Sequence, residues 1–184
     1  MLSPAAHVVI QELYVRGVQW RPAPRPLDLP GLPRILLLVD PASIRVLSER
    51  STQESSAVAL TVKDVDGDCY LVIRHLTREA GEWRTCCGSE GVDQPVAGKS
   101  GPYAALSAVA HDGRFFAGGR VESGERDVVR VRLVWEDGYD LEDKVENGIV
   151  LFLGVRDSLN SAVTEFLDPA GRMVGRRPAF VDQR

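Results

Sequence analysis

The residues in this 184-residue sequence best suited to chemistry are three cysteines and three histidines. Cys86 and Cys87 are adjacent, whereas zinc ligands are normally separated by two to four positions. A cysteine nucleophile also needs a histidine within hydrogen-bond reach, and the sequence gives no evidence that any histidine lies there. The histidines are His7, His75 and His111. We therefore predict no catalytic residue, no metal site and no cofactor.

The cysteine count leaves one thiol unpaired whatever pairs form. One interpretation is that Cys69, Cys86 and Cys87 are all reduced thiols in a cytoplasmic protein. The other is a disulfide that joins Cys69 to one of the adjacent pair. Neighbouring side chains on a strand point to opposite faces, so only one of Cys86 and Cys87 could face Cys69. Both interpretations remain open.

Two further motifs resemble ligand sites but lack essential parts. Gly98-Lys99-Ser100 lacks the earlier glycine of a phosphate-binding loop, because Asp93 stands at that position. Asp64, Asp66 and Asp68 could meet a cation on one face of a strand. The glycine is one position too early for an EF-hand, so a solvated hairpin tip is the favoured interpretation.

An N-terminal helix is expected to begin after Ser3 and to end at Gly17. Ser3 is a suitable N-cap and Pro4 suits the first helical position. Val9 and Leu13 lie on one apolar face of this helix. That face could pack on its own domain or on a partner protein.

A proline-rich arm follows the helix. Five prolines lie between positions 20 and 34 and exclude a helix or an interior strand. The segment is expected to be stiff and extended, close to polyproline II. Pro30 and Pro33 form a Pro-x-x-Pro pattern that could contact a partner, although a linker is the simpler interpretation.

From position 34 onward, short apolar runs alternate with turn residues, which predicts about ten strands. The main turns are Asp66-Gly67, His111-Asp112-Gly113, Asp137-Gly138, Asn147-Gly148 and Asp168 to Gly171. A Gly-, Ser- and Pro-rich loop is expected over 88–101. No strand–helix alternation occurs, so the sequence predicts an all-β fold, an antiparallel β-sandwich, with one N-terminal helix and a Pro-rich arm.

Two of these turns lie ten residues apart within 130–154. They predict a three-stranded meander with strands near 128–135, 139–146 and 149–155. On its central strand Tyr139, Leu141, Asp143 and Val145 share one face. The alternate residues are charged and are expected to face solvent.

The overall composition argues against several classes of protein. A formal net charge of −4 argues against nucleic-acid binding, which needs a basic surface. No apolar run is long enough to span a membrane. The first fourteen residues lack the pattern of a signal peptide. These features predict a cytoplasmic location.

The second half of the chain carries a recurring set of turns. They are Gly119-Arg120-Val121, Asp127 to Leu133, Asp137-Gly138, Val145 to Gly148 and Asp168 to Arg172. This set resembles a β-sandwich module of uncharacterised high-GC actinobacterial proteins. The resemblance implies a small β-sandwich and implies no particular activity.

We expect two parts, an N-terminal helix and Pro-rich arm over 1–33 and a β-sandwich domain over 34–184. The expected function is a non-catalytic protein-interaction module that binds a partner protein through loops or an edge strand. One alternative is a structural subunit of a larger assembly, such as a phage or secretion particle. The chain could then also form homo-oligomers. A second alternative is a small-ligand or thiol enzyme.

Overall fold

The computed structural model describes residues 2–16, 18–20, 35–37, 39–93, 101–159 and 161–180. The elements run in this order: α1 (Pro4–Arg16), β1 (Val18–Trp20), β2 (Ile35–Leu37), β3 (Val39–Ser51), β4 (Ser55–Asp64), β5 (Cys69–Glu79), β6 (Glu82–Val92), β7 (Tyr103–His111), β8 (Arg114–Glu122), β9 (Arg130–Val134), β10 (Asp140–Lys144), β11 (Ile149–Gly154), β12 (Val163–Leu167) and β13 (Met173–Pro178). All strand pairs are antiparallel. The expected all-β, sandwich-like fold with one helix is confirmed.

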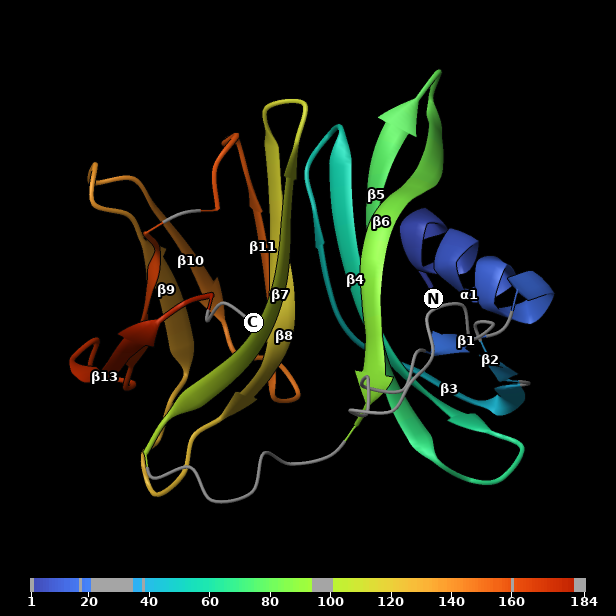
Figure 1. The fold of residues 1–184 in the computed structure, drawn as a ribbon, viewed down its shortest axis with the longest axis horizontal. Coiled ribbons are helices and arrows are strands. Elements are labelled where there is room, and N and C mark those ends of the chain that lie inside the picture. The colour runs from blue at the N-terminus through green and yellow to red at the C-terminus, as the bar shows by residue number, and fades with distance from the viewer. Residues whose placement is uncertain are drawn as a thin grey trace, which may run out of the picture.

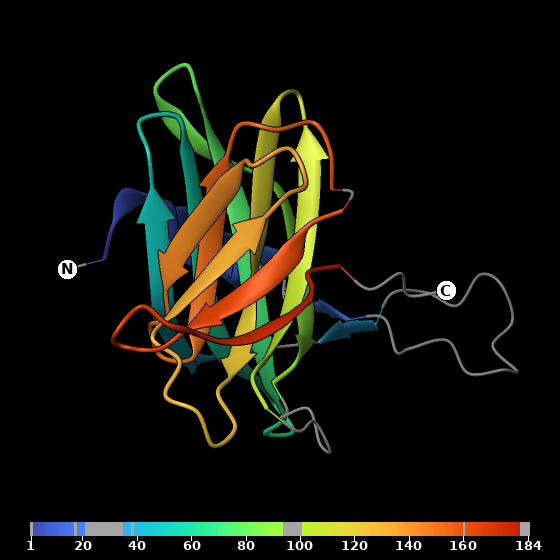
Figure 2. The same cartoon turned by 90° about the vertical axis from the view of Figure 1, so that its left-hand side faces the viewer.

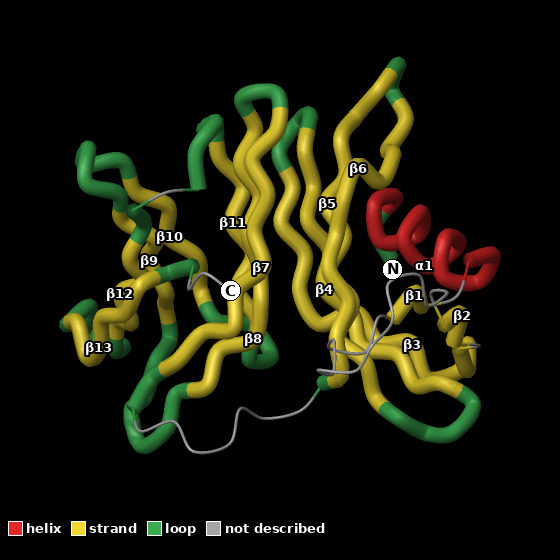
Figure 3. The backbone as a smooth tube through the Cα atoms, in the orientation of Figure 1, coloured by secondary structure: helices red, strands yellow, loops and turns green. Residues whose placement is uncertain are grey.

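The strands form three stacked sheets, with the helix outside the stack (Figure 1). The N-terminal sheet has the order β3-β4-β5-β6, the middle sheet β11-β8-β7 and the C-terminal sheet β10-β9-β12-β13. A separate two-stranded sheet joins β1 and β2. Figure 3 shows the middle sheet between the other two, and α1 on the far face of the N-terminal sheet. The sandwich therefore has one more sheet than the usual two.

Each layer boundary has its own apolar core. The first lies between α1 and the N-terminal sheet, and includes Val9, Leu13, Leu60 and Leu76. The second lies between the N-terminal and middle sheets and contains small residues such as Ala57 and Ala59 beside Ile73 and Leu151. The third, between the middle and C-terminal sheets, holds most of the buried aromatic side chains, which are Phe115, Trp135, Phe152 and Phe166. The middle sheet is consequently apolar on both faces.

The helix begins as the sequence predicts. The Ser3 hydroxyl accepts a hydrogen bond from the Ala6 N–H at 3.0 Å, the interaction expected of an N-cap. Val9 and Leu13 are almost fully buried against the N-terminal sheet. The helix therefore belongs to the packed body, because its apolar face covers a sheet of the same chain.

The hairpins expected at Asp66-Gly67, Asp112-Gly113, Asp137-Gly138 and Asp168 to Gly171 are confirmed. Their glycines have φ between +71° and +94°, which only glycine adopts without strain. The loop expected over 88–101 is shorter than predicted, since β6 continues to Val92. Residues 94–100 lie outside the described part, as does the arm over 21–34.

The predicted three-stranded meander is wrong in one respect. β9 and β10 do form a hairpin, and Asn147-Gly148 makes a tight turn closed by a bridge between Glu146 and Ile149. Beyond that bridge β11 leaves its neighbour and pairs with β8 in the middle sheet. The reason is the composition of β11, whose run IVLFL is apolar on both faces and suits a strand covered on both sides.

Candidate binding cleft

The middle sheet has two edges that differ in how they are protected. β11 packs alongside both β3 and β10, so neighbouring strands cover its edge. β7 pairs with β8 on one side, and no described strand pairs with its other side. Figure 2 shows β3 and β11 at one margin of the stack and β7 at the other. An unpaired strand edge is a template for pairing with another chain.

The other edge strands of the three larger sheets carry features that discourage such pairing. β13 ends in Arg176, Arg177 and Pro178 and is interrupted by a bulge. β10 is five residues long, and four of them are charged. β6 is bulged opposite His75 and carries several charged side chains. β3 is irregular at two places and is covered by β11. Charge, proline, bulges and short length are the usual protections of a sheet edge.

β7 has none of these protections. It is nine residues long, its register with β8 is regular throughout, and it carries no charge before His111. Its sequence, YAALSAVA, resembles that of a strand inside a sheet more than that of an edge. This mismatch between sequence and position makes β7 the candidate interaction element.

The turn after β7 determines which of its backbone groups face outward. Asp112 and Gly113 both have positive φ, as in the two-residue turn that joins His111 and Arg114 as a hydrogen-bonded pair. Hydrogen-bonded and non-hydrogen-bonded pairs alternate along an antiparallel ladder. The outward-facing residues are therefore Ala104, Leu106, Ala108 and Ala110. Their N–H and C=O groups point away from β8.

A cleft of about 570 Å³ runs between β5–β6 and β7–β8 beside this edge. Leu71 and Ile73 line it from the N-terminal sheet, and Ala105 and Ser107 line it from β7. Arg120, which also lines the cleft, forms an ion pair with Asp93 at 2.6 Å, which joins β8 to the end of β6. The lining thus combines apolar side chains with a charged pair, as is common for binding sites.

Glycines keep the cleft open and the strands close together. A Cβ on Gly119 would lie 1.8 Å from the carbonyl oxygen of Ala105, so only glycine fits where β8 passes β7. A Cβ on Gly91 would meet nothing within 4 Å, which shows free space beside β6. The cleft thus offers apolar lining residues, room for small side chains and an unpaired backbone edge.

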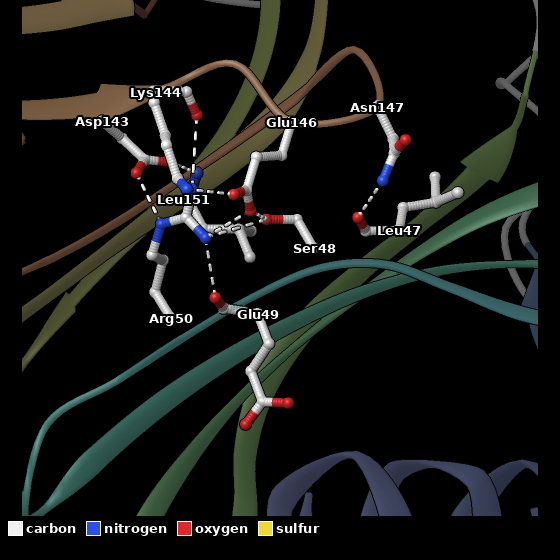
Figure 4. A network of polar contacts seen from close by, with 9 residues as sticks. All are labelled: Leu47, Ser48, Glu49, Arg50, Asp143, Lys144, Glu146, Asn147 and Leu151. Carbon is white, nitrogen blue, oxygen red and sulfur yellow. Dashed lines mark hydrogen bonds and ion pairs between the residues drawn. The ribbon is translucent and has the colours of Figure 1, made fainter. Parts of the chain in front are cut away.

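The opposite margin of the same two sheets is closed by a polar network (Figure 4). Arg50 Nε donates to Asp143 Oδ1 at 2.6 Å, and Arg50 Nη1 donates to Glu146 Oε2 at 2.7 Å. Asp143 Oδ2 also accepts the Leu151 N–H at 2.7 Å, and Asn147 Nδ2 donates to the Leu47 carbonyl at 2.6 Å. These bonds fasten β3 to β10 and to the turn between β10 and β11.

The network shifts the ionisation of its members in opposite directions. Burial raises the pKa of Asp143, although the Leu151 N–H and the Arg50 guanidinium oppose the shift. Hydrogen bonds from Lys144 and Arg50 lower the pKa of Glu146 to about 2. Sequence periodicity placed Asp143 on the apolar face of its strand but gave no partner for it. Arg50 lies 93 positions away, and no local pattern relates the two.

Two of the residues predicted as partner contacts, Val9 and Leu13, do not line this cleft, because they belong to α1 and are buried against the N-terminal sheet. The other two, Pro30 and Pro33, lie outside the described residues. The prediction of a partner contact at an edge strand stays a prediction, and the edge strand that fits it is β7. The signal that could have found it is the uncharged run from Tyr103 to Ala110.

The three cysteines are free thiols. Cys87 of β6 pairs in register with His75 of β5, whereas Cys69 is the first residue of β5. The stretch of β5 from Cys69 to His75 is about 20 Å long at 3.3 Å per residue, so Cys69 and Cys87 lie about that far apart. Disulfide geometry allows at most about 7 Å between Cα atoms. This separation excludes the disulfide between Cys69 and either Cys86 or Cys87 that the sequence left open.

The histidines do not join the thiols. Cys86 Sγ bonds the main-chain oxygen of His75 at 3.3 Å, and no hydrogen bond joins an imidazole to a cysteine sulfur within the described ranges. The His75 ring packs on Phe116, with ring centroids 5.0 Å apart, and burial lowers the pKa of His75 to about 4. His111 is exposed beside Asp112 in the turn. His7 bonds Gln11 on the helix surface.

The aspartates at the β4–β5 turn have a structural role. Asp64 Oδ1 accepts the N–H groups of Asp66 and Asp68, and its second oxygen accepts the Tyr70 hydroxyl at 3.2 Å. Burial, together with Asp64, raises the pKa of Tyr70 to about 12. No cluster of three or more His, Cys, Asp or Glu side chains among the described residues is arranged to hold a metal ion.

No family model matches the chain, and neither the curated proteins nor the solved structures give a significant match. The resemblance to actinobacterial β-sandwich modules therefore stays a prediction. Among the described residues, no helix combines the length and the apolar character needed to cross a lipid bilayer.

Proposed function

We propose that the protein is a non-catalytic interaction module that binds an extended segment of a partner protein along the open edge of β7. The partner would add a fourth strand to the middle sheet, as in other cases of strand addition. Its main chain would pair with Ala104, Leu106, Ala108 and Ala110. Alternate side chains of the partner would enter the cleft between β6 and β7.

One observation carries this proposal: β7 is the long edge strand with no protection against pairing. Edge strands that are meant to stay unpaired are normally blunted, and the other edges of the three larger sheets follow that rule. The cleft supplies what main-chain pairing alone lacks, a means of selecting side chains. Gly91, Ala105 and Ser107 leave space for small or apolar side chains next to the edge.

The electrostatics of the chain fit a protein partner better than a nucleic acid, because the net charge is −4. The three free thiols are compatible with the reducing cytoplasm, which is the location that we propose.

The test is a peptide-display selection against the full-length protein, with Ala108→Pro as the diagnostic variant. Proline at position 108 removes an outward N–H and leaves the β7–β8 bonds intact, because proline is tolerated on a free edge. Peptides selected on the wild type are expected to bind this variant at least about tenfold more weakly, the equivalent of one lost hydrogen bond at the interface.

The matched control is Ala108→Ser, which keeps the N–H at the same position and should retain binding. Thermal unfolding of both variants checks that the fold is intact. Selected peptides that bind Ala108→Pro and wild type equally well would contradict the proposal.

A second candidate is a structural subunit that pairs β7 with β7 of another copy. The same unblunted edge favours it, since two antiparallel copies can pair about a two-fold axis. Light scattering over a range of concentrations distinguishes the two. A dimer that Ala108→Pro converts to a monomer supports assembly, and a monomer at all concentrations supports the interaction module.

A further inference from the structure

Cys86 and Cys87 lie at a bulge in β6. His75 of β5 pairs with Cys87, and Leu76 pairs with Thr85, so Cys86 is the extra residue. On a regular strand the two side chains would point to opposite faces. A bulge interrupts that alternation. The two Sγ atoms consequently lie 3.6 Å apart, on the same side of the strand.

This separation matches the bite of a two-thiolate metal ligand. A metal ion bound tetrahedrally at about 2.3 Å from each sulfur holds the two sulfur atoms about 3.8 Å apart. The thiols of the folded chain already stand close to that distance, so little rearrangement is needed. Adjacent cysteines are poor zinc ligands on a regular strand, because their side chains point to opposite faces. That argument does not apply at this bulge.

The pair is accessible and lies in a polar setting. Cys86 is exposed, Cys87 is half-buried, and both line a cavity of about 280 Å³ between β6 and α1. Arg74, which also lines this cavity, forms an ion pair with Glu90. Two oxygen atoms of this cavity, Thr85 Oγ1 and Glu90 Oε2, are buried and have no hydrogen-bond partner among the described residues.

We propose that Cys86 and Cys87 together form a bidentate binding site for a thiophilic metal or metalloid ion, with both sulfur atoms as ligands. Thiolates select soft ions of this class. Each thiol gives up its proton when its sulfur bonds the ion, and no electrons are exchanged. With an arsenic(III) oxide, R–As=O, two As–S bonds form, and the two thiol protons leave with the oxygen atom as water.

The experiment uses the reduced full-length protein and phenylarsine oxide. One equivalent is expected to bind, and the thiol count measured after denaturation should fall from three to one, the remaining thiol being Cys69. Cys69→Ser should bind as the wild type does. Cys86→Ser and Cys87→Ser should each bind at least about tenfold more weakly, because a single sulfur loses the advantage of chelation.

A peptide that spans Arg84 to Glu90 tests the contribution of the bulge. It contains the same two cysteines without the sheet, so the folded protein should bind phenylarsine oxide at least about tenfold more tightly through preorganisation. Equal affinities for peptide and protein would overturn the proposal. Retention of wild-type affinity in either Cys86→Ser or Cys87→Ser would also overturn it.

Discussion

The interface between the N-terminal and middle sheets has two margins that are built in opposite ways. At the closed margin, Arg50 on β3 binds Asp143 in β10 and Glu146 in the turn between β10 and β11. At the open margin, β6 and β7 leave a cleft beside an unpaired strand. The chain thus joins its own strands through a charged network at the closed margin and leaves β7 uncharged from Tyr103 to Ala110 at the open margin. That distribution suggests that the closed margin supplies stability and the open margin supplies recognition.

The largest expected effect comes from breaking the closed margin. Arg50→Ala leaves the Asp143 carboxylate, whose side chain is 8% exposed, without its cation. The free energy of unfolding, measured by urea denaturation, should fall by about 3 kcal/mol. The loss should be smaller at acid pH, because Asp143 can then be protonated and a neutral carboxyl costs less to bury.

Arg120→Ala is the matched variant at the open margin. Arg120 also joins the two sheets, through its ion pair with Asp93 at the end of a strand. Its removal should lower the free energy of unfolding by less than Arg50→Ala does, because Asp93 is 15% exposed and water can solvate its carboxylate better than that of Asp143. Equal losses in the two variants would contradict the division between a stabilising margin and a binding margin.

The smallest effect is a change in pH dependence. The pKa of Glu146 is about 2 in the folded chain, below its ordinary value of 4.5, because Lys144 and Arg50 donate hydrogen bonds to it. Stability from this group is fully present above about pH 4.5 and is lost as the pH falls towards 2. Glu146→Gln should therefore flatten the fall in stability between these values, as followed by urea midpoints at several pH values.

Glu125→Gln removes one negative charge from an exposed loop and provides the control. It should leave the pH profile of the wild type unchanged. If both variants flatten the profile to the same extent, the effect reflects net charge and not the network.

Much of the fold follows from local patterns in the sequence. Ser3 and Pro4 determine where the helix begins. Three Asp-Gly turns and the turn from Asp168 to Gly171 locate four of the hairpins. These features depend on the conformational preferences of one or two residues. The sheet that β11 joins could not be predicted in the same way. The turn expected at Asn147-Gly148 is present, but the strand that follows it pairs with β8 and not with β10.

The site was harder to predict than the fold. The bulge that brings the side chains of Cys86 and Cys87 together depends on how β6 aligns with β5. On a regular strand taken alone, the two side chains would point to opposite faces. The charged network depends on Arg50 and Asp143, which lie far apart in the sequence. The open edge was predicted in general terms. Its assignment to β7 required the order of strands in the sheet.

Amide hydrogen exchange of the dilute full-length protein, resolved by residue, tests the open edge most directly. The outward N–H groups of Leu106 and Ala108 should exchange quickly, whereas those of Ser107 and Val109, bonded to β8, should be protected. Equal protection of all four amides would show that the edge is already paired and would contradict the proposed role of β7.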